Sequence, residues 1–390
     1  MIKILHVISD TNIGGAGVHL CNLLSQIDRS FFEISVCLPQ NNLLAPKIRA
    51  LDLPVIETKH GGDRSADLLA VPELISVLRR RAPHILHTHS ALYARLAGCF
   101  CHVPVLINTR HCAEENQSIS PLRHLAAAGL EKILGGHTVA TAHYVENELI
   151  REGTRADSIH VICNGSRPLP LLSPIEKSEI RQSLGLFPHD FTVGMVARLE
   201  KGKGHDTFLG AAALCIQKNP NVRFLIVGDG SRARELRTLA ARLGLGDRVI
   251  FTGFCADVAP IMNILHLNVN CSEISETSSL SLSEGMSVGA VPVVSNCGGN
   301  AFMAGAGQNG IVFPVGNKEI LAAHILALAQ DRPRLAQLSE RAKQRFQQDF
   351  TADAMTKKTE ALYRSLWENA PRRLYSEGEQ PSLAENSREK

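Results

Sequence analysis

Short apolar runs alternate with helical stretches along most of the chain, and this alternation limits the possible folds more than any other feature. The runs KILHVIS and EISVCL lie near the start, and TVGMVA, RFLIVG and VPVVS lie in the second half. Strands that alternate with helices form parallel sheets covered by helices on both faces. The pattern therefore predicts an α/β protein with doubly wound sheets.

A stretch rich in Pro, Gly and Ser, NGSRPLPLLSP at positions 164–174, interrupts this alternation near the middle of the 390-residue chain. Because domains cluster at about 100–200 residues, we expect two domains, 1–168 and 169–345. A helical segment, 346–370, follows them, and the polar tail 371–390 is expected to be disordered. Ligands of doubly wound sheets bind beyond the carboxyl ends of the strands, so two facing domains would form a central cleft.

The composition is that of an ordinary soluble globular protein, with 44% hydrophobic and 20% charged residues. No apolar run reaches the roughly 18–20 residues of a membrane span, and MIKILHVISD runs into Asp10 without a signal-peptide cleavage site. The ten cysteines lack zinc-site or redox-motif spacing, which favours reduced thiols in the cytosol. A net charge of +3 argues against nucleic-acid binding.

Two glutamates, Glu276 and Glu284, lie in the stretch SETSSLSLSEG, which follows an expected strand at 267–271. On one continuous helix their carboxylates would be roughly 12 Å apart, which excludes a proton-sharing pair. If Glu276 lies in a loop and Glu284 on a helix, each can contact a different end of one elongated ligand.

The start of that helix is a candidate anion site. The free backbone N–H groups near Ser278, Ser279 and Leu280 would bind a group such as phosphate. The alternative is a capping box from Ser281 to Glu284, in which Glu284 only bonds the N-cap amide. That alternative leaves Glu276 without a role.

A basic loop follows the expected strand at 192–197, in the stretch VGMVARLEKGKGHD. Arg198 and Lys203 on this loop suit a diphosphate, because Arg forms bidentate bonds and Lys acts as a point charge. A solvated basic loop without a ligand is the alternative.

Glycines join the first expected strand to a helix in ISDTNIGGAGVHL. Gly14, Gly15 and Gly17 allow the backbone to approach a charged ligand, although the third glycine of a dinucleotide fingerprint is missing. A tight turn without a ligand is the alternative here.

A second glycine pattern competes with the first. In IVGDGSRAREL, Gly228, Gly230 and Ala233 fit the G-x-G-x-x-A form of an NAD site. The acidic residue that should close the next strand is absent, since Asp247 precedes that strand. NAD binding is therefore only a minor alternative.

Histidines occur in two loops after expected strands, His87 and His89 in HILHTHS and His111 in INTRHCAEEN. A neutral imidazole there can hydrogen-bond a hydroxyl or a transferring oxygen. His87 and His89 would share one face of a strand, and packing under a helix is the favoured interpretation for that pair. No set of His, Cys and Asp has metal-ligand spacing, and Asp-x-Asp is absent, so no metal site is predicted.

Taken together, GGAGVH, TRH, the R-x4-K pair Arg198 and Lys203, VGDG and the E-x7-E pair resemble the motifs of family 4 retaining glycosyltransferases. The resemblance is strong over 192–295 and looser in the first half. It implies a GT-B fold, with two facing Rossmann-like domains and a central cleft. The first domain would bind the acceptor and the second the nucleotide-sugar donor, while segment 346–370 would cross back to the first domain.

The resemblance also implies roles for the charged residues. Arg198 and Lys203 would neutralise the donor diphosphate. Glu284 would hold the ribose, and Glu276 would contact the donor sugar, so each glutamate would bind a different part of one donor. His111 would bond the sugar near the reacting carbon.

Further residues would belong to the same donor site. Gly15 and Gly17 would let the first-domain loop close on the diphosphate, and Gly228 lies in the VGDG turn. Relatives often have E-G-F-G where this chain has Glu276-Thr277-Ser278-Ser279. This difference leaves the identity of the sugar open.

The resemblance implies an enzyme without metal or other cofactor that retains the anomeric configuration by same-face attack. A glycan or lipid-linked acceptor in bacterial surface polysaccharide or glycolipid synthesis is expected. A nucleotide-sugar epimerase and a non-catalytic nucleotide-sugar-binding protein are the alternatives.

Weak contact with the inner face of the cell membrane is a further hypothesis. It rests on the run 79–81 of three arginines and on SPLRHLAAAGLEKILGG, which has apolar residues at helical spacing. A core-facing helix is the favoured alternative for the latter stretch.

Overall fold

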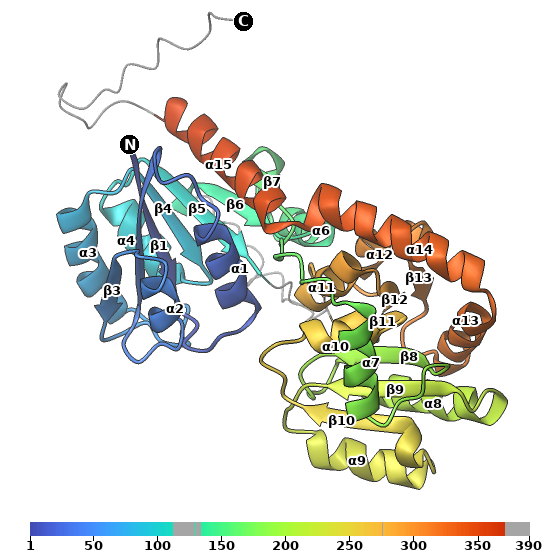
Figure 1. The fold of residues 1–390 in the computed structure, drawn as a ribbon. Coiled ribbons are helices and arrows are strands. Elements are labelled where there is room, and N and C mark those ends of the chain that lie inside the picture. The colour runs from blue at the N-terminus through green and yellow to red at the C-terminus, as the bar shows by residue number, and fades with distance from the viewer. Residues whose placement is uncertain (112–128, 130–133, 275, 371–390) are drawn as a thin grey trace, which may run out of the picture.

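The structure is a computed structural model that describes residues 1–111, 129, 134–274 and 276–370 (Figure 1). The tail 371–390, for which the sequence predicts disorder, lies outside the described residues. Most of SPLRHLAAAGLEKILGG also lies outside them. In the described part of the chain, we find no helix that combines the length and the apolar character needed to cross a membrane.

The first half of the chain forms a seven-stranded parallel sheet with the order β3-β2-β1-β4-β5-β6-β7. Its central strands are buried on both faces, which explains their nearly continuous apolar runs. The strands are β1 (Ile2–Ile8), β2 (Phe32–Pro39), β3 (Val55–Thr58), β4 (Ile85–His89), β5 (Val105–Arg110), β6 (His137–Ala140) and β7 (Ile159–Val161). The described helices are α1 (Gly15–Leu24), α2 (Ala45–Arg49), α3 (Ala70–Arg81), α4 (Leu92–Phe100) and α6 (His143–Arg151).

The second half forms a six-stranded parallel sheet with the order β10-β9-β8-β11-β12-β13. Its strands are β8 (Phe191–Val196), β9 (Val222–Val227), β10 (Val249–Gly253), β11 (Leu267–Asn270), β12 (Val291–Ser295) and β13 (Ile311–Phe313). Its helices are α7 (Pro174–Ser183), α8 (His205–Lys218), α9 (Ala233–Arg242), α10 (Ala259–Ile264), α11 (Leu280–Val288), α12 (Asn300–Met303), α13 (Lys318–Gln330) and α14 (Arg332–Arg345).

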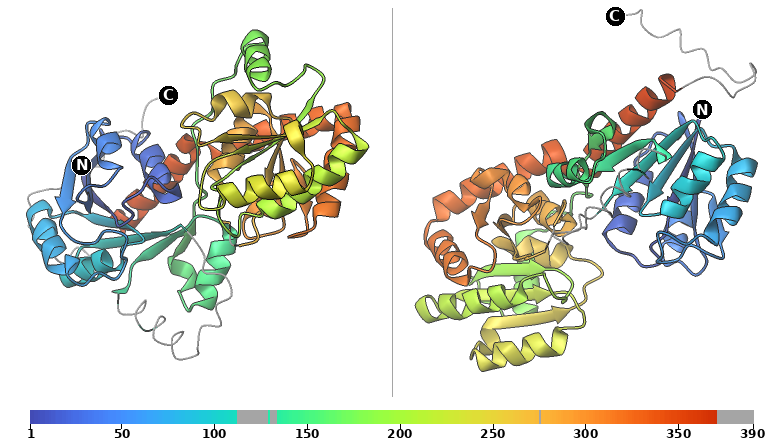
Figure 2. Two further views of the ribbon diagram at one scale, coloured as in Figure 1. Left: turned by 90° about the horizontal axis from the view of Figure 1, so that it is seen from below. Right: turned by 180° about the vertical axis from the view of Figure 1, so that it is seen from behind.

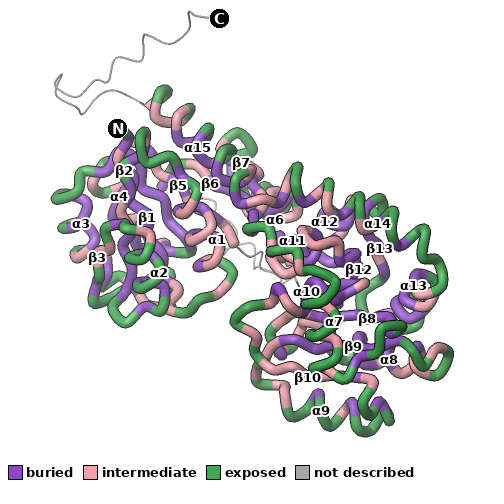
Figure 3. The backbone as a smooth tube through the Cα atoms, viewed as in Figure 1, coloured by how far each residue is buried: buried purple, intermediate pink, exposed green. Residues whose placement is uncertain are grey.

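Both sheets have the predicted doubly wound character. In each, the first strand of the half lies inside the sheet and the chain winds outward in both directions. Buried residues concentrate in the strands and on the inward faces of the helices (Figure 3). The predicted α/β class with two Rossmann-like sheets is therefore confirmed.

The last helix, α15 (Ala352–Glu368), packs on the first sheet although it follows the second in the sequence (Figures 1 and 2). Met355, Leu362 and Tyr363 belong to the same buried cluster as strands β1 and β2. The indole of Trp367 stacks on His84, with ring centroids 4.3 Å apart. Helix α15 thus completes the core of the first sheet.

The chain crosses between the two sheets twice, and the two crossings lie side by side. The Ser166 N–H donates to the Phe350 carbonyl at 2.9 Å, and the Ala352 N–H donates to the Ser166 carbonyl at 2.9 Å. A Cβ on Gly165 would lie 2.3 Å from the Thr351 carbonyl oxygen, so this contact needs glycine. We call residues 164–166 and 350–352 the paired crossing.

Candidate active site

The two glutamates lie on different elements, as the sequence predicts. Glu276 is in the loop after β11, and Glu284 is on α11, which ends at Gly289 in the left-handed conformation. The capping-box alternative was wrong, because α11 begins before Ser281. Ser279 is the N-cap, and its hydroxyl accepts from the Leu282 N–H at 3.4 Å.

The carboxyl group of Glu284 is half-buried within the second turn of α11. It has no hydrogen-bond or ion-pair partner in the described part of the chain. Burial raises its pKa to about 7, because removal from water penalises the charged form. A half-buried carboxylate without a protein partner can accept hydrogen bonds from a ligand.

The N-terminus of α11 is open to an anion. The backbone N–H groups of Leu280 and Ser281 find no partner among the described residues, and the first turn contains no acidic side chain. The N–H of Ser279 faces only the sulfur of Met303, at 3.1 Å, which is a weak acceptor. The hydroxyl oxygen of Ser278 is buried and also lacks a described partner.

Lys203 and Glu276 form an ion pair between the basic loop and the loop before α11. Glu276 also accepts a hydrogen bond from the Ser272 hydroxyl at 2.6 Å. Arg198 is exposed, and its guanidinium forms no hydrogen bond or ion pair in the described structure, although its charge acts on the nearby Glu200. The solvated-loop interpretation therefore fits Arg198 but not Lys203, which is three-quarters buried against an acid.

The glycines of the VGDG turn have a packing role. A Cβ on Gly228 would lie 2.1 Å from the Ala197 carbonyl oxygen, and one on Gly230 would lie 2.6 Å from the Leu199 carbonyl oxygen. Both glycines therefore let this turn pack against the loop that carries Arg198. Their G-x-G spacing is explained without NAD.

The glycines before α1 behave differently. Gly14, Gly15 and Gly17 all have negative φ, so the backbone turn does not require glycine at these positions. A Cβ on Gly17 would meet Leu44 at 2.6 Å, but a Cβ on Gly15 would meet nothing within 4 Å. Gly15 is exposed at the start of α1, where neither conformation nor packing within the protein explains it.

The predicted histidines join a larger buried cluster. His89 bonds His6 on one side, with the ring nitrogens 3.2 Å apart, and His111 on the other, at 3.0 Å. His87 lies beside them and bonds the Tyr363 hydroxyl of α15 at 2.6 Å and the Thr109 hydroxyl at 2.7 Å. Packing under a helix is thus correct for His87, whereas His89 bonds other histidines.

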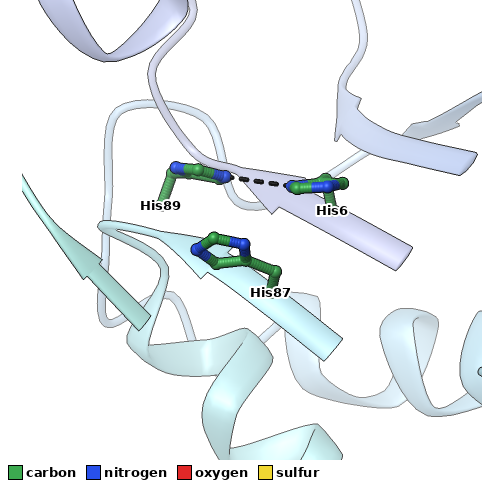
Figure 4. A group of neighbouring side chains, drawn as sticks. All are labelled: His6, His87 and His89. Carbon is green, nitrogen blue, oxygen red and sulfur yellow. Dashed lines mark hydrogen bonds between the residues drawn. The ribbon is translucent and has the colours of Figure 1, made fainter. Parts of the chain in front are cut away.

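Three of these rings, His6 on β1 and His87 and His89 on β4, lie together on the two neighbouring strands (Figure 4). Each offers a ring nitrogen within 4.8 Å of the others, and a second group of three contains His19, His89 and His111. The sequence showed no metal-ligand spacing because each group combines residues from distant segments of the chain. Burial lowers the pKa of His6 to about 3 and that of His19 to about 4, so both are neutral at pH 7.

The loop before α11 touches the first domain at two points. The Thr277 hydroxyl donates to the His111 carbonyl at 3.2 Å. The Asn164 amide donates to the Ser278 carbonyl at 3.1 Å, and its oxygen accepts from His19 at 2.9 Å. These bonds bring His111 of the first domain next to the start of α11.

Sequence reasoning missed three residues that position this site, Ser272, His19 and Asn164. Asn164 lies in the stretch that predicts the domain boundary, and no local pattern indicates its bond to Ser278. His19 ends the GGAGVH motif, but its bond to Asn164 joins segments 145 positions apart and has no local signal. Ser272 had no local signal, because its hydrogen bond to Glu276 depends on how the loop after β11 folds.

The arginine run 79–81 lies in the last turn of α3, where all three side chains are exposed. Cations at a helix C-terminus interact favourably with the helix dipole. This position accounts for the run without lipid.

Two family models match the chain on either side of the domain-boundary stretch. The Glycosyltransferase Family 4 model matches residues 13–167, and the Glycosyl transferases group 1 model matches residues 176–345. The chain belongs to the family 4 glycosyltransferases. Most of the predicted donor-site residues of this family member lie within the second match.

Relatives in this family include a putative glycosyltransferase EpsD of Bacillus subtilis, 27% identical over 58% of this chain and 61% of EpsD. The lipopolysaccharide core biosynthesis mannosyltransferase LpsB of Rhizobium meliloti is 27% identical over 53% of this chain and 60% of LpsB. The matched part of this chain thus spans about three-fifths of these relatives.

Solved structures show the fold of this family member. The structure of Anabaena HepE with UDP has a TM-score of 0.82 at 24% identity, covering 93% of this chain and 100% of HepE. The HepE complex with UDP-glucose has a TM-score of 0.79 with the same coverage. The predicted GT-B fold is confirmed.

Proposed function

We propose that this protein is a retaining glycosyltransferase that moves a sugar from a nucleotide-diphosphate sugar to a glycan or lipid-linked acceptor. The observation that carries this proposal is the arrangement around the loop before α11. That loop pairs with Lys203, leads into an open helix N-terminus and contacts His111 of the opposite domain. A family 4 chain with this arrangement has charged and polar groups for each part of such a donor.

The donor diphosphate would lie between the basic loop and α11. Arg198 is free to form bidentate bonds, and the unpaired N–H groups of Leu280 and Ser281 supply donors with the favourable helix dipole. Lys203 would turn from Glu276 to the phosphates. Gly15 and Gly17 would allow the start of α1 to approach the same phosphates, which gives exposed Gly15 a reason to lack a side chain.

The rest of the donor would extend in two directions from the diphosphate. Glu284 would accept hydrogen bonds from the ribose hydroxyls, since its carboxylate has no protein partner. Glu276 and His111 would contact the sugar, because they lie at the boundary between the two domains. Gly228 would act indirectly by holding the Arg198 loop against the VGDG turn.

In the proposed reaction, an acceptor oxygen forms a bond to the anomeric carbon on the face from which the diphosphate departs. The bond between that carbon and the phosphate oxygen breaks, and the phosphate oxygen takes the acceptor proton. Arg198, Lys203 and the α11 N-terminus stabilise the charge that develops on the leaving group. The mechanism needs neither a metal ion nor a protein base, because these groups carry the charge and the phosphate takes the proton.

The names of the relatives support a setting in polysaccharide or lipopolysaccharide synthesis. LpsB is named for lipopolysaccharide core biosynthesis. We therefore propose a bacterial surface glycan or glycolipid as the product, formed on the cytosolic side of the membrane.

Thermal unfolding with UDP, GDP, ADP, NAD and the corresponding nucleotide sugars tests this function. A ligand at 100 times its dissociation constant adds about 2.7 kcal/mol to the free energy of unfolding. We expect one nucleotide diphosphate to stabilise the protein and Glu284→Ala to abolish the effect. Stabilisation by NAD alone would contradict the proposal. Release of an epimer from the donor alone, or donor binding with neither hydrolysis nor transfer, would identify the two alternative functions.

A further inference from the structure

Three histidines form one continuous hydrogen-bonded series from the interior of the first sheet to the domain boundary. Nδ1 of His6 lies 3.2 Å from Nε2 of His89, and Nδ1 of His89 lies 3.0 Å from Nε2 of His111. His6 is on β1, His89 ends β4 and His111 follows β5. His6 and His89 are fully buried, whereas His111 is half-buried. We call these residues the histidine series.

All three rings are neutral near pH 7. Burial lowers the pKa of His6 to about 3, and burial holds the pKa values of His89 and His111 well below the ordinary histidine range. A neutral imidazole has one N–H donor and one acceptor nitrogen. The hydrogen bonds of the histidine series can therefore point in only two directions, and either direction fixes the tautomer of all three rings.

The two ends of the series differ in their surroundings. Nε2 of His6 and Nδ1 of His111 are buried and have no partner among the described residues. One direction leaves an N–H on His6, inside the sheet where no ligand can reach it. The other places the N–H on His111, beside the loop that leads into α11. Each direction leaves one N–H without a protein partner, and an unpaired buried N–H is costly. Only at His111, beside the loop that leads into α11, can a ligand oxygen accept from that N–H, which favours the second direction.

We infer that His6 and His89 are positioning residues that hold His111 as the Nδ1–H tautomer, so that His111 donates a hydrogen bond to an oxygen of the ligand. In this arrangement His6 Nδ1–H donates to His89 Nε2, and His89 Nδ1–H donates to His111 Nε2. The end of the series at the domain boundary is then a donor whose direction is set by His6 and His89, two residues that do not touch the ligand. The identity of the ligand oxygen, on the donor sugar, rests on the proposed function, but the tautomer does not.

His87 does not belong to the series, although it stacks on His89 with centroids 4.6 Å apart. Both of its ring nitrogens bond hydroxyl groups, those of Tyr363 and Thr109. A metal ion held by the group in Figure 4 would have to break one of these bonds and the bond between His6 and His89. The observed bonding of His6, His87 and His89 therefore favours the series over a metal ion held by that group.

Nitrogen-15 NMR of the ligand-free protein, labelled at histidine, tests this inference directly. Long-range proton–nitrogen correlations distinguish Nδ1–H, Nε2–H and charged rings, and single substitutions assign the signals. We expect His6, His89 and His111 all in the Nδ1–H form between pH 6 and 8. The Nε2–H form at His111, a charged ring at pH 7, or one equivalent of bound Zn²⁺ in the purified protein would overturn the inference.

Two substitutions of His89 provide a second test. His89→Asn keeps a donor near the position of Nδ1, whereas His89→Phe removes it. We expect His111 to stay in the Nδ1–H form in His89→Asn and to lose that single form in His89→Phe. His160→Phe is the matched control, because it breaks another histidine pair, His137 and His160, whose ring nitrogens are 3.2 Å apart. The same His111 tautomer in all three variants would also overturn the inference.

Nucleotide binding separates this inference from the proposed function. If UDP, GDP and ADP all fail to bind while the tautomers are as expected, the proposed function fails and the inference stands. If a nucleotide sugar binds, we expect His89→Phe to lower kcat by about 10-fold or more with little change in nucleotide diphosphate affinity. An unchanged kcat in a folded His89→Phe variant would contradict the role of the series in catalysis.

Discussion

Lys203 and Glu276, which are 73 positions apart in the sequence, form an ion pair in the ligand-free protein. Both are proposed to contact the donor, Lys203 at the diphosphate and Glu276 at the sugar. Each therefore has a partner before the donor arrives, and donor binding must replace that partner. Substitution of Glu276 can therefore distinguish its role from that of Lys203.

Neutralising Glu276 should have opposite effects on binding and turnover. Glu276→Gln releases Lys203, so a nucleotide diphosphate without a sugar should bind about 3–10-fold more tightly, as expected for an ion pair worth about 1 kcal/mol. Turnover should fall because the sugar loses its contact. Calorimetric titration and a transfer assay would measure the two effects. Glu273→Gln, an exposed acid in the same loop, is the control, and weaker binding by Glu276→Gln would contradict the exchange of partners.

Removing a cation should affect turnover more than folding. Arg198→Ala and Lys203→Ala should each lower kcat by about 100-fold, the typical cost of losing one group that stabilises transition-state charge. Arg198 is exposed and forms no hydrogen bond or ion pair in the described structure, so its replacement should leave the melting temperature nearly unchanged. Lys201→Ala, an exposed cation in the same loop, should keep normal turnover. Near-normal turnover in both Arg198→Ala and Lys203→Ala would remove the assignment.

Gly15 offers a test of ligand approach that does not disturb packing. Gly15→Ala meets nothing within 4 Å and starts a helix, so the free energy of unfolding should stay equal or rise by about 0.5–1 kcal/mol. Binding of the nucleotide diphosphate should weaken, because the new methyl group lies where the phosphates approach. Unchanged affinity would show that the loop stays away from the ligand. Gly17→Ala, which meets Leu44, is the comparison with a packing cost.

Glu284 should make both stability and donor affinity depend on pH. Its carboxyl has an ordinary pKa of 4.5 when exposed and a pKa of about 7 in the folded protein, so the folded state binds the proton more tightly. The free energy of unfolding should therefore fall as pH rises from 4.5 to 7 and level off above. Glu284→Gln should flatten this part of the profile, and urea unfolding at several pH values would measure it.

Donor affinity should change in the opposite direction. Ribose hydroxyls donate to the charged carboxylate, so the affinity for a nucleotide sugar should rise by about tenfold per pH unit below 7 and reach a plateau above it. A nucleotide sugar is the suitable probe, because its diphosphate does not titrate in this range. Equal affinity at pH 6 and pH 8 in the unmodified protein would contradict the role of Glu284.

The sequence predicted the features that depend on residues close together in the chain. Parallel sheets follow from the alternation of strands and helices, and the place of Glu284 on a short helix ending at Gly289 follows from local signals. The start of that helix was ambiguous because Ser279 and Ser281 are both good N-caps. The packing of Ser279 near Met303 is a tertiary contact that no local pattern contains.

Contacts between distant segments could not be predicted in this way. His6, His89 and His111 meet only because β1, β4 and β5 are neighbours in the sheet, and strand order is not encoded in local spacing. The same limit applies to Gly228, whose spacing fits a cofactor motif but whose neighbour is Ala197 from the previous strand end. Glycine spacing indicates that other atoms approach the backbone closely, but it does not show whether they belong to a ligand or to the protein.

The paired crossing fixes how the two halves can move. Residues 164–166 and 350–352 are hydrogen-bonded to each other, so the two connecting segments form one narrow link between the halves. Such a connection permits rotation about its own line and resists sliding of one half past the other. If the two halves rotate relative to each other, Gly165 and Thr351 would therefore lie near the axis, and the first turns of α1 and α11 would move farther.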